Sequence, residues 1–249
     1  MALLLTKEHA SYLMLSGDIP SSLPRAIVKH YIRSLSPRFE FAIVVIGAFG
    51  LFAARSLAMV FDASGPTPIS DSGLLSIIVH EVVVAAALLT FLKIRQWTLG
   101  GLGVAPSLRE TLVGIGLAVA AYTAYVVVVL TAVGLSPYVS HVAANPIFSS
   151  SGLSLVMIVA VSIVNSIYEE LFVAGYVISA LKERRSMWTA INVSIAIRLS
   201  YHLYQGPIGV LSVIPLGFIF AYWYARTGRL WPLIVAHALS DLLGLLAAS

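Results

Sequence analysis

Several ionisable side chains lie inside stretches of sequence that are otherwise apolar, where a charge is costly to bury. They are Arg55, His80, Glu81, Glu169, Glu170, Arg198, His202, His237 and Asp241. A carboxylate among apolar residues can act as a general base on water, and a histidine can move the proton. A second histidine and a polar side chain can stabilise an oxyanion. Peptide-bond hydrolysis needs all of these groups, so the pattern predicts a hydrolytic site.

Helical spacing places some of these side chains on common faces. His237 and Asp241 are four residues apart, so they share one face of a helix. Arg198 and His202 are spaced in the same way and are also expected to share a face.

The paired carboxylates are expected to divide their tasks. Glu169 and Glu170 are neighbours and lie about 100° apart on a helix, so they do not point the same way. We therefore expect one to face a reacting centre and the other to pair with a structural partner. Asn165 lies four residues before Glu169, on the same helix face, and is a supporting residue of the site.

The elements that carry these residues are long and apolar. The chain has 249 residues, 59% of them hydrophobic and 10% charged, and its mean hydropathy is +0.95. Apolar runs that approach or exceed ~20 residues are typical of membrane spans. We predict an all-α, polytopic transmembrane bundle with about seven spans, at residues 41–61, 74–94, 111–134, 153–180, 188–204, 207–225 and 230–247.

The chain is expected to divide into two parts. Residues 1–40 are predicted to form a cytoplasmic or peripheral segment, with a short basic helix near 24–35 on the membrane surface. Residues 41–249 are predicted to form the transmembrane domain, with the protease-like core at 153–247.

The distribution of Lys and Arg supports this layout. With the N-terminus in the cytoplasm, the basic residues outside the spans fall on the cytoplasmic side, and none occurs in the predicted external loops at 62–73, 135–152 and 205–206. Topology thus explains the net charge of +4, and no nucleic-acid partner is expected. Measured from the cytoplasmic ends of their spans, Glu169, His202 and Asp241 lie at roughly 16–21 Å and His237 at roughly 10 Å.

Some of these groups also allow a different interpretation. His80 and Glu81 fit a satisfied polar pair between helices, and Arg55 can snorkel or pair with Glu81. A divalent metal such as zinc could be held by Glu169, His202 and His237. We favour no metal cofactor, because the HExxH spacing is absent and the ligands would come from three helices. The chain has no Cys, which excludes disulfides and thiolate sites.

Three motifs in order resemble those of a known family. The segment 169–175, EELFVAG, resembles the first motif, EExxxR followed by Gly, of the CAAX protease and bacteriocin-processing (CPBP) family, which includes the type II CAAX prenyl proteases. His202 stands where the second motif, FxxxH, has its histidine. His237 and Asp241 match the third motif, a His with Asn or Asp four residues later. Further similarity lies in residues 97–104 and 224–232.

The resemblance implies an intramembrane endopeptidase that opens to the cytoplasm. By the family pattern, Glu169 activates water with help from His202. His237 and Asp241 stabilise the oxyanion, and Glu170 orients the site. Both a metalloprotease mechanism and a metal-free glutamate mechanism have been argued for the family, and we favour the second.

The sequence departs from the family pattern at two positions. The motif Arg is replaced by Ala174, and the motif Phe is replaced by Arg198. The usual Arg would share a helix face with Glu170 and balance its charge. We therefore predict that Arg198 supplies the guanidinium to Glu170 from the next span.

The leading interpretation is a peptidase that cleaves a peptide or membrane-protein substrate within the lipid bilayer, in the plasma (inner) membrane of a prokaryote. A catalytically silent family member acting as a scaffold or regulator is an alternative, because the motif Arg is missing. A proton-coupled transporter that uses the same carboxylates is another alternative, although the sequence has no internal repeat.

Overall fold

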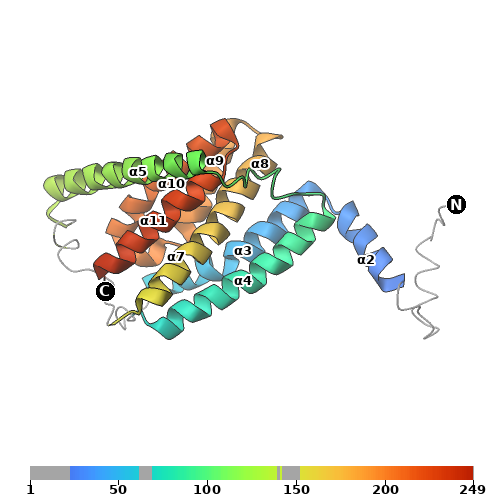
Figure 1. The fold of residues 1–249 in the computed structure, drawn as a ribbon, viewed down its shortest axis with the longest axis horizontal. Helices are drawn as coiled ribbons and strands as arrows, with labels where there is room; N and C mark the ends of the chain where they lie inside the picture. The colour runs from blue at the N-terminus through green and yellow to red at the C-terminus, as the bar shows by residue number, and fades with distance from the viewer. Residues whose placement is uncertain (1–22, 62–68, 139–140, 142–151, 249) are drawn as a thin grey trace.

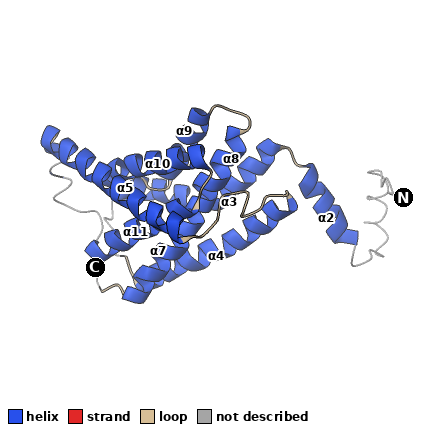
Figure 2. Cartoon of the chain, turned by 45° about the horizontal axis from the view of Figure 1, so that its top comes forward, coloured by secondary structure: helices blue, strands red, loops and turns tan. Residues whose placement is uncertain are grey.

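The computed structural model describes residues 23–61, 69–138, 141 and 152–248, and this part of the chain consists of helices joined by loops (Figure 2). Most of the predicted segment at 1–40 therefore lies outside the described residues. The elements are α2 (Leu23–Ser34), α3 (Pro37–Val60), α4 (Asp71–Ile94), α5 (Leu108–Leu135), α7 (Leu155–Glu169), the π-helix η1 (Glu170–Tyr176), α8 (Val177–Lys182), α9 (Met187–Ser200), the 3₁₀-helix η2 (Leu203–Gln205), α10 (Gly206–Thr227) and α11 (Trp231–Ala248).

Five helical stretches are long and apolar enough to cross a membrane, namely Pro37–Val60, Asp71–Ile94, Leu108–Leu135, Leu155–Lys182 and Leu203–Thr227. The helix at Trp231–Ala247 is apolar but shorter. The chain is therefore an integral, multi-pass membrane protein, and each of the seven predicted spans coincides with a helix.

The predicted span at 188–204 is too long. Helix α9 has 14 residues and ends at Ser200. At about 1.5 Å per residue it extends only about 21 Å, less than the ~30 Å hydrocarbon core. Since the turn begins at Tyr201, His202 does not continue the helix face of Arg198, and this part of the prediction was wrong.

Serine side chains define where most of the long helices begin. In each case the hydroxyl accepts a hydrogen bond from the backbone N–H three residues later, which satisfies a free donor of the first turn. The capping residues are Ser36, Ser70, Ser107, Ser154 and Ser186. At the other end of α10, Gly228 adopts φ 66°, a left-handed conformation that suits glycine and ends the helix.

The stretch formed by α7, η1 and α8 runs through the middle of the bundle, with α3 and α4 below it and α11 beside it in Figure 1. Of the 18 residues in its most apolar part, 56% are buried, whereas in the corresponding parts of α3, α4 and α5 only 17–22% are buried. The continuous stretch is therefore the core helix, and the other three expose most of their apolar surface to lipid. On α5, Gly114 permits close packing, because a Cβ there would lie 2.7 Å from the Pro232 carbonyl oxygen of α11.

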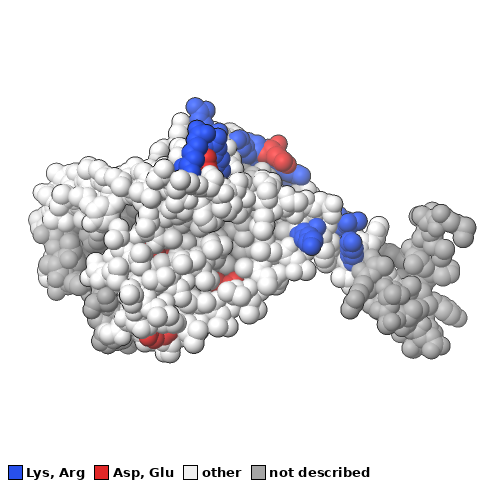
Figure 3. Space-filling view, viewed as in Figure 1, with Lys and Arg blue, Asp and Glu red and all other residues white. Residues whose placement is uncertain are grey.

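Basic side chains gather at one end of the bundle. Figure 3 shows Lys and Arg along the upper and right-hand edges of the view, around the ends of α4, α8 and α10, and almost none over the rest of this face. At this end the loops before α5 and α11 are joined by a hydrogen bond from Leu230 N to the Gly103 carbonyl, 2.9 Å long. The distribution agrees with the predicted cytoplasmic orientation of this end.

Helix α2 projects away from the bundle (Figure 1) and matches the short basic helix expected near 24–35. Arg95 at the end of α4 donates hydrogen bonds to the carbonyls of Ile32 and Arg33, which connects α2 to the bundle. Its location on the membrane surface remains a prediction.

Candidate active site

The two predicted carboxylates lie where the core helix changes its geometry. Glu169 is the last residue of α7, and Glu170 is the first residue of the π-helix η1. Such wide turns are rare and frequently occur at functional sites. The turn is supported from α9, where the Ser194 hydroxyl donates to the Val173 carbonyl at 2.7 Å.

Arg198 of α9 binds both carboxylates. Its Nη2 lies 2.6 Å from Glu170 Oε1, and its Nη1 lies 3.2 Å from Glu169 Oε2. The cross-helix pair between Arg198 and Glu170 expected from the sequence is therefore present. One planar guanidinium with several donors thus reaches both carboxylates. That one of them faces a reacting centre while the other pairs with a structural partner stays a prediction.

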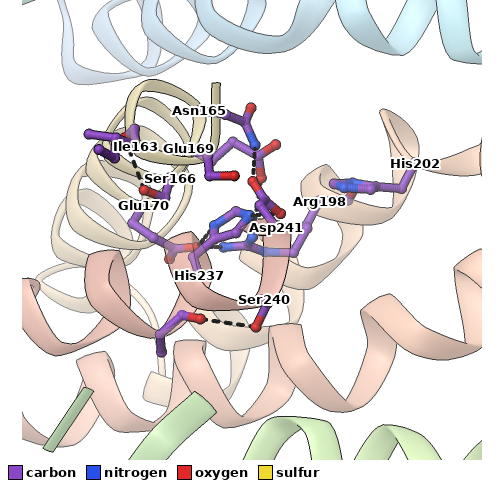
Figure 4. Close-up of polar contacts among 12 residues, drawn as sticks. Ile163, Asn165, Ser166, Glu169, Glu170, Arg198, His202, His237, Ser240 and Asp241 are labelled. Carbon is purple, nitrogen blue, oxygen red and sulfur yellow. Dashed lines mark hydrogen bonds and ion pairs between the residues drawn. The ribbon is translucent and has the colours of Figure 1, made fainter. Parts of the chain in front are cut away.

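A second chain of contacts links Glu170 to α11. His237 Nδ1 lies 2.7 Å from Glu170 Oε1, and His237 Nε2 lies 3.4 Å from Asp241 Oδ1. Asn165 of α7 donates a hydrogen bond of 2.9 Å to Asp241 Oδ2. Figure 4 shows these side chains converging from α7, η1, α9 and α11. Five residues predicted from the sequence, Asn165 among them, thus form one polar cluster with Arg198.

Tyr201 belongs to this cluster and was not predicted from the sequence. Its hydroxyl donates to Glu169 Oε2 at 2.6 Å, and its ring stacks on Phe49 with centroids 4.9 Å apart. The available signal was its position three residues after Arg198, a spacing that brings side chains together on a helical turn. Glu169 Oε2 is therefore held by two donors from the end of α9.

His202 lies beside the cluster rather than within it (Figure 4). Its Nδ1 is 2.9 Å from the Arg198 carbonyl oxygen. Because a carbonyl can only accept, Nδ1 carries a hydrogen, and Nε2 of the neutral ring is an acceptor. His202 is close enough to Glu169 for the two to interact electrostatically, although no hydrogen bond joins them.

The cluster is closed on most sides. Glu169 is 6% exposed, Glu170 0%, Arg198 2% and His237 4%. By contrast, the Asp241 side chain is 26% exposed, and His202 is half-buried. Water or a substrate would therefore reach the cluster most directly past Asp241 and His202.

Glu81 of α4 adds a further buried carboxylate close to the cluster. It is 1% exposed and interacts electrostatically with Glu169 and Asp241. Neither Glu81 Oε2 nor His80 Nε2 has a hydrogen-bond partner among the described residues. His80 instead packs edge-on against Phe52, with ring centroids 5.1 Å apart. The satisfied His80–Glu81 pair expected from the sequence is therefore not formed.

The suggested metal ligands do not fit a metal ion. In the part of the chain that the structure describes, no three His, Asp or Glu side chains are grouped to hold one. The positive charge beside Glu169 is already supplied by Arg198. Both ring nitrogens of His237 face carboxylates. No step through a metal is therefore derived for Glu169, His202 and His237.

Taken together, the fold and the cluster define a helical membrane protein with a glutamate pair, an arginine and histidines buried among its last helices. Residues 151–243 match the family described as type II CAAX prenyl endopeptidase Rce1-like, and this region contains the whole cluster except Glu81. Over this region the chain is similar to the type II CAAX prenyl endopeptidases. No curated protein and no solved structure matches the chain.

Proposed function

We propose that this chain is an intramembrane endopeptidase that hydrolyses a peptide bond with water activated by Glu169. The observation that carries the proposal is the convergence of Glu169, Glu170, Arg198, His237 and Asp241 in one buried cluster. Buried charge in a membrane protein is costly and typically functional. The Rce1-like match over the same helices supports a peptidase.

Glu169 is the proposed general base. Tyr201 and Arg198 both bind its Oε2, which leaves Oε1 to accept a proton from water. His202 Nε2 is the acceptor that would orient this water from the other side. Arg198 and Tyr201 are positioning residues in this scheme, because they act through Glu169.

The hydroxide formed in this way adds to the carbonyl carbon of the substrate and gives a tetrahedral oxyanion. Asn165 and His237 carry the N–H groups that could stabilise it. Asp241 accepts a hydrogen bond from Asn165, and its Oδ1 lies 3.4 Å from His237 Nε2. We therefore assign it to holding these donors rather than to contacting the oxyanion. Collapse breaks the C–N bond, and the proton on Glu169 passes to the leaving amine.

Glu170 is proposed to orient the site. Its Oε1 binds both Arg198 and His237, and the residue is completely buried. It therefore connects the part of the cluster that holds the base with the part that holds the oxyanion donors. The proposed substrate is a peptide or membrane protein that enters from the bilayer, and the proposed location is the plasma (inner) membrane of a prokaryote.

One observation favours the alternative of a catalytically silent scaffold. Arg198 forms ion pairs with both carboxylates, and most of the cluster is inaccessible to solvent. A buried ion-pair cluster of this kind can serve the fold alone. A scaffold would keep its cellular role when Glu169 loses its charge.

Proteomics of membrane fractions tests the proposal. Cells with the wild-type chain are compared with cells carrying Glu169→Gln, and the termini of all membrane proteins are determined. We expect at least one protein to keep an uncut terminus in the variant. Glu110→Gln is the matched control, because Glu110 pairs with the half-exposed Arg229 and lies outside the cluster. Identical termini in wild type and Glu169→Gln would refute the peptidase and favour the scaffold.

A further inference from the structure

A cavity of about 520 Å³ lies at the basic end of the bundle, away from the glutamate cluster. The start of α3, the segment after α4 and the α8–α9 turn enclose it. The proposed peptidase mechanism uses none of its residues.

The floor of this cavity is a fixed polar network around Glu40. This residue is 7% exposed and accepts three hydrogen bonds. They come from Arg95 Nε at 2.5 Å, Trp97 Nε1 at 2.9 Å and the Tyr176 hydroxyl at 3.1 Å. Because these three donors all bind one carboxylate, the floor is preorganised, and Glu40 balances the charge of Arg95.

The rim of the cavity carries unbalanced positive charge. Arg38, Arg184 and Arg185 are exposed, and none of them forms an ion pair within the described residues. The lining as a whole contains four arginines and two glutamates. An anion that enters the cavity would therefore meet uncompensated guanidinium groups, which bind phosphate oxygens well.

The remaining lining is apolar. Phe41, Leu181 and Pro37 line the same cavity, and Trp97 contributes its ring beside Tyr176 at a centroid distance of 5.1 Å. Phe39, between the lining residues Arg38 and Glu40 in the chain, is 66% exposed. A ligand that fits has an anionic head and an apolar body.

We propose that this cavity binds the phosphate headgroup of an anionic phospholipid from the cytoplasmic leaflet. The cavity opens where the spans α3 and α8 reach the basic end of the bundle. This level is where juxtamembrane arginines meet anionic headgroups. The charge of the rim complements the phosphate, and the apolar lining suits the glycerol and first acyl carbons. This inference is independent of the proposed peptidase activity.

Lipid binding by the full chain tests the proposal. The purified protein in detergent is titrated with phosphatidylglycerol or phosphatidylcholine, and retained lipid is measured by native mass spectrometry. We expect phosphatidylglycerol to be retained preferentially. The triple variant Arg38→Gln, Arg184→Gln, Arg185→Gln is expected to lose this preference, roughly fivefold for each arginine removed. The control Lys93→Gln, Arg109→Gln, Arg226→Gln removes as many charges from the same end and is expected to keep it.

Competition and crosslinking experiments distinguish other ligands from the lipid, and the crosslinking does not depend on whether a variant folds. Inorganic phosphate and a short peptide with a free carboxylate are added as competitors, and neither is expected to displace the lipid. A photoreactive phosphatidylglycerol is expected to crosslink within residues 37–41 or 180–185, a readout that needs no variant. Equal loss in both triple variants, displacement by phosphate or peptide, or crosslinks confined to other segments would each overturn the proposal.

Discussion

Arg198→Met should destabilise the fold as well as abolish activity. The variant keeps a side chain of similar length but removes the guanidinium from a site that is 2% exposed. Among the described residues, Glu169 and Glu170 then remain as adjacent buried carboxylates whose hydrogen bonds come from Tyr201 and His237 alone. An unpaired buried charge costs far more than an exposed one.

The magnitude follows from the burial of both partners. Removing one partner of a buried ion pair costs about 3–5 kcal/mol. This corresponds to a decrease in the ratio of folded to unfolded protein between about a hundredfold and a few thousandfold. Arg229→Met is the matched control, because its ion pair with Glu110 has an arginine side chain that is 49% exposed. Because the arginine of that pair is about half-exposed, its removal should cost less than the removal of Arg198.

Thermal unfolding of the detergent-solubilised protein, followed by fluorescence-detected gel filtration, measures this difference. Combining Arg198→Met with Glu169→Gln and Glu170→Gln should recover most of the lost stability, because the buried charges then disappear together. Activity should not return, because the general base is gone. Unfolding of Arg198→Met at the wild-type temperature, or a triple variant no more stable than Arg198→Met, would refute the role given to the buried charges.

The double variant Ala174→Arg, Arg198→Phe restores the family pattern and should recover the stability lost in Arg198→Ala. A double variant that unfolds at the same temperature as Arg198→Ala would contradict this prediction. Tyr201→Phe should lower cleavage of a substrate identified by proteomics by about 10–100-fold, since a hydrogen bond to charged Glu169 is removed. Unchanged cleavage would remove Tyr201 from the site. Gly103→Ala should unfold the protein at a lower temperature, because φ is +80° and the new Cβ would lie 1.9 Å from a carbonyl oxygen. Gly116→Ala is the control and should not lower the unfolding temperature, because a Cβ there would meet open space. Equal unfolding temperatures for the two variants would argue against the close packing at Gly103.

The helices could be predicted closely from the sequence, because apolar runs and serine caps are local signals. The predicted spans at 41–61 and 74–94 differ by a few residues from Pro37–Val60 and Asp71–Ile94. The span at 188–204 was the exception. Its apolar run continues past Ser200, but the turn there depends on contacts with other helices, such as the bond from Tyr204 N to Ser56 Oγ at 2.9 Å.

The sequence was enough to predict most of the residues that form the candidate site, but not which of them bind one another. Spacing along a helix indicated that His237 and Asp241 share a face, and they lie 3.4 Å apart. It did not indicate that Glu170 would bind Arg198 and His237 through the same oxygen. Such contacts depend on which helices are neighbours and how they are rotated, and a single sequence does not contain that information.

Residue type and local periodicity were enough to predict that this protein crosses the membrane and that its last helices carry buried charge. The binding of two adjacent carboxylates by Arg198, and the contribution of Tyr201, became visible in the folded chain. The physical reason lies in the packing of α9 against the core helix. There the π-helix widens the turn after Glu169, and the end of α9 brings three donors to one pair of glutamates.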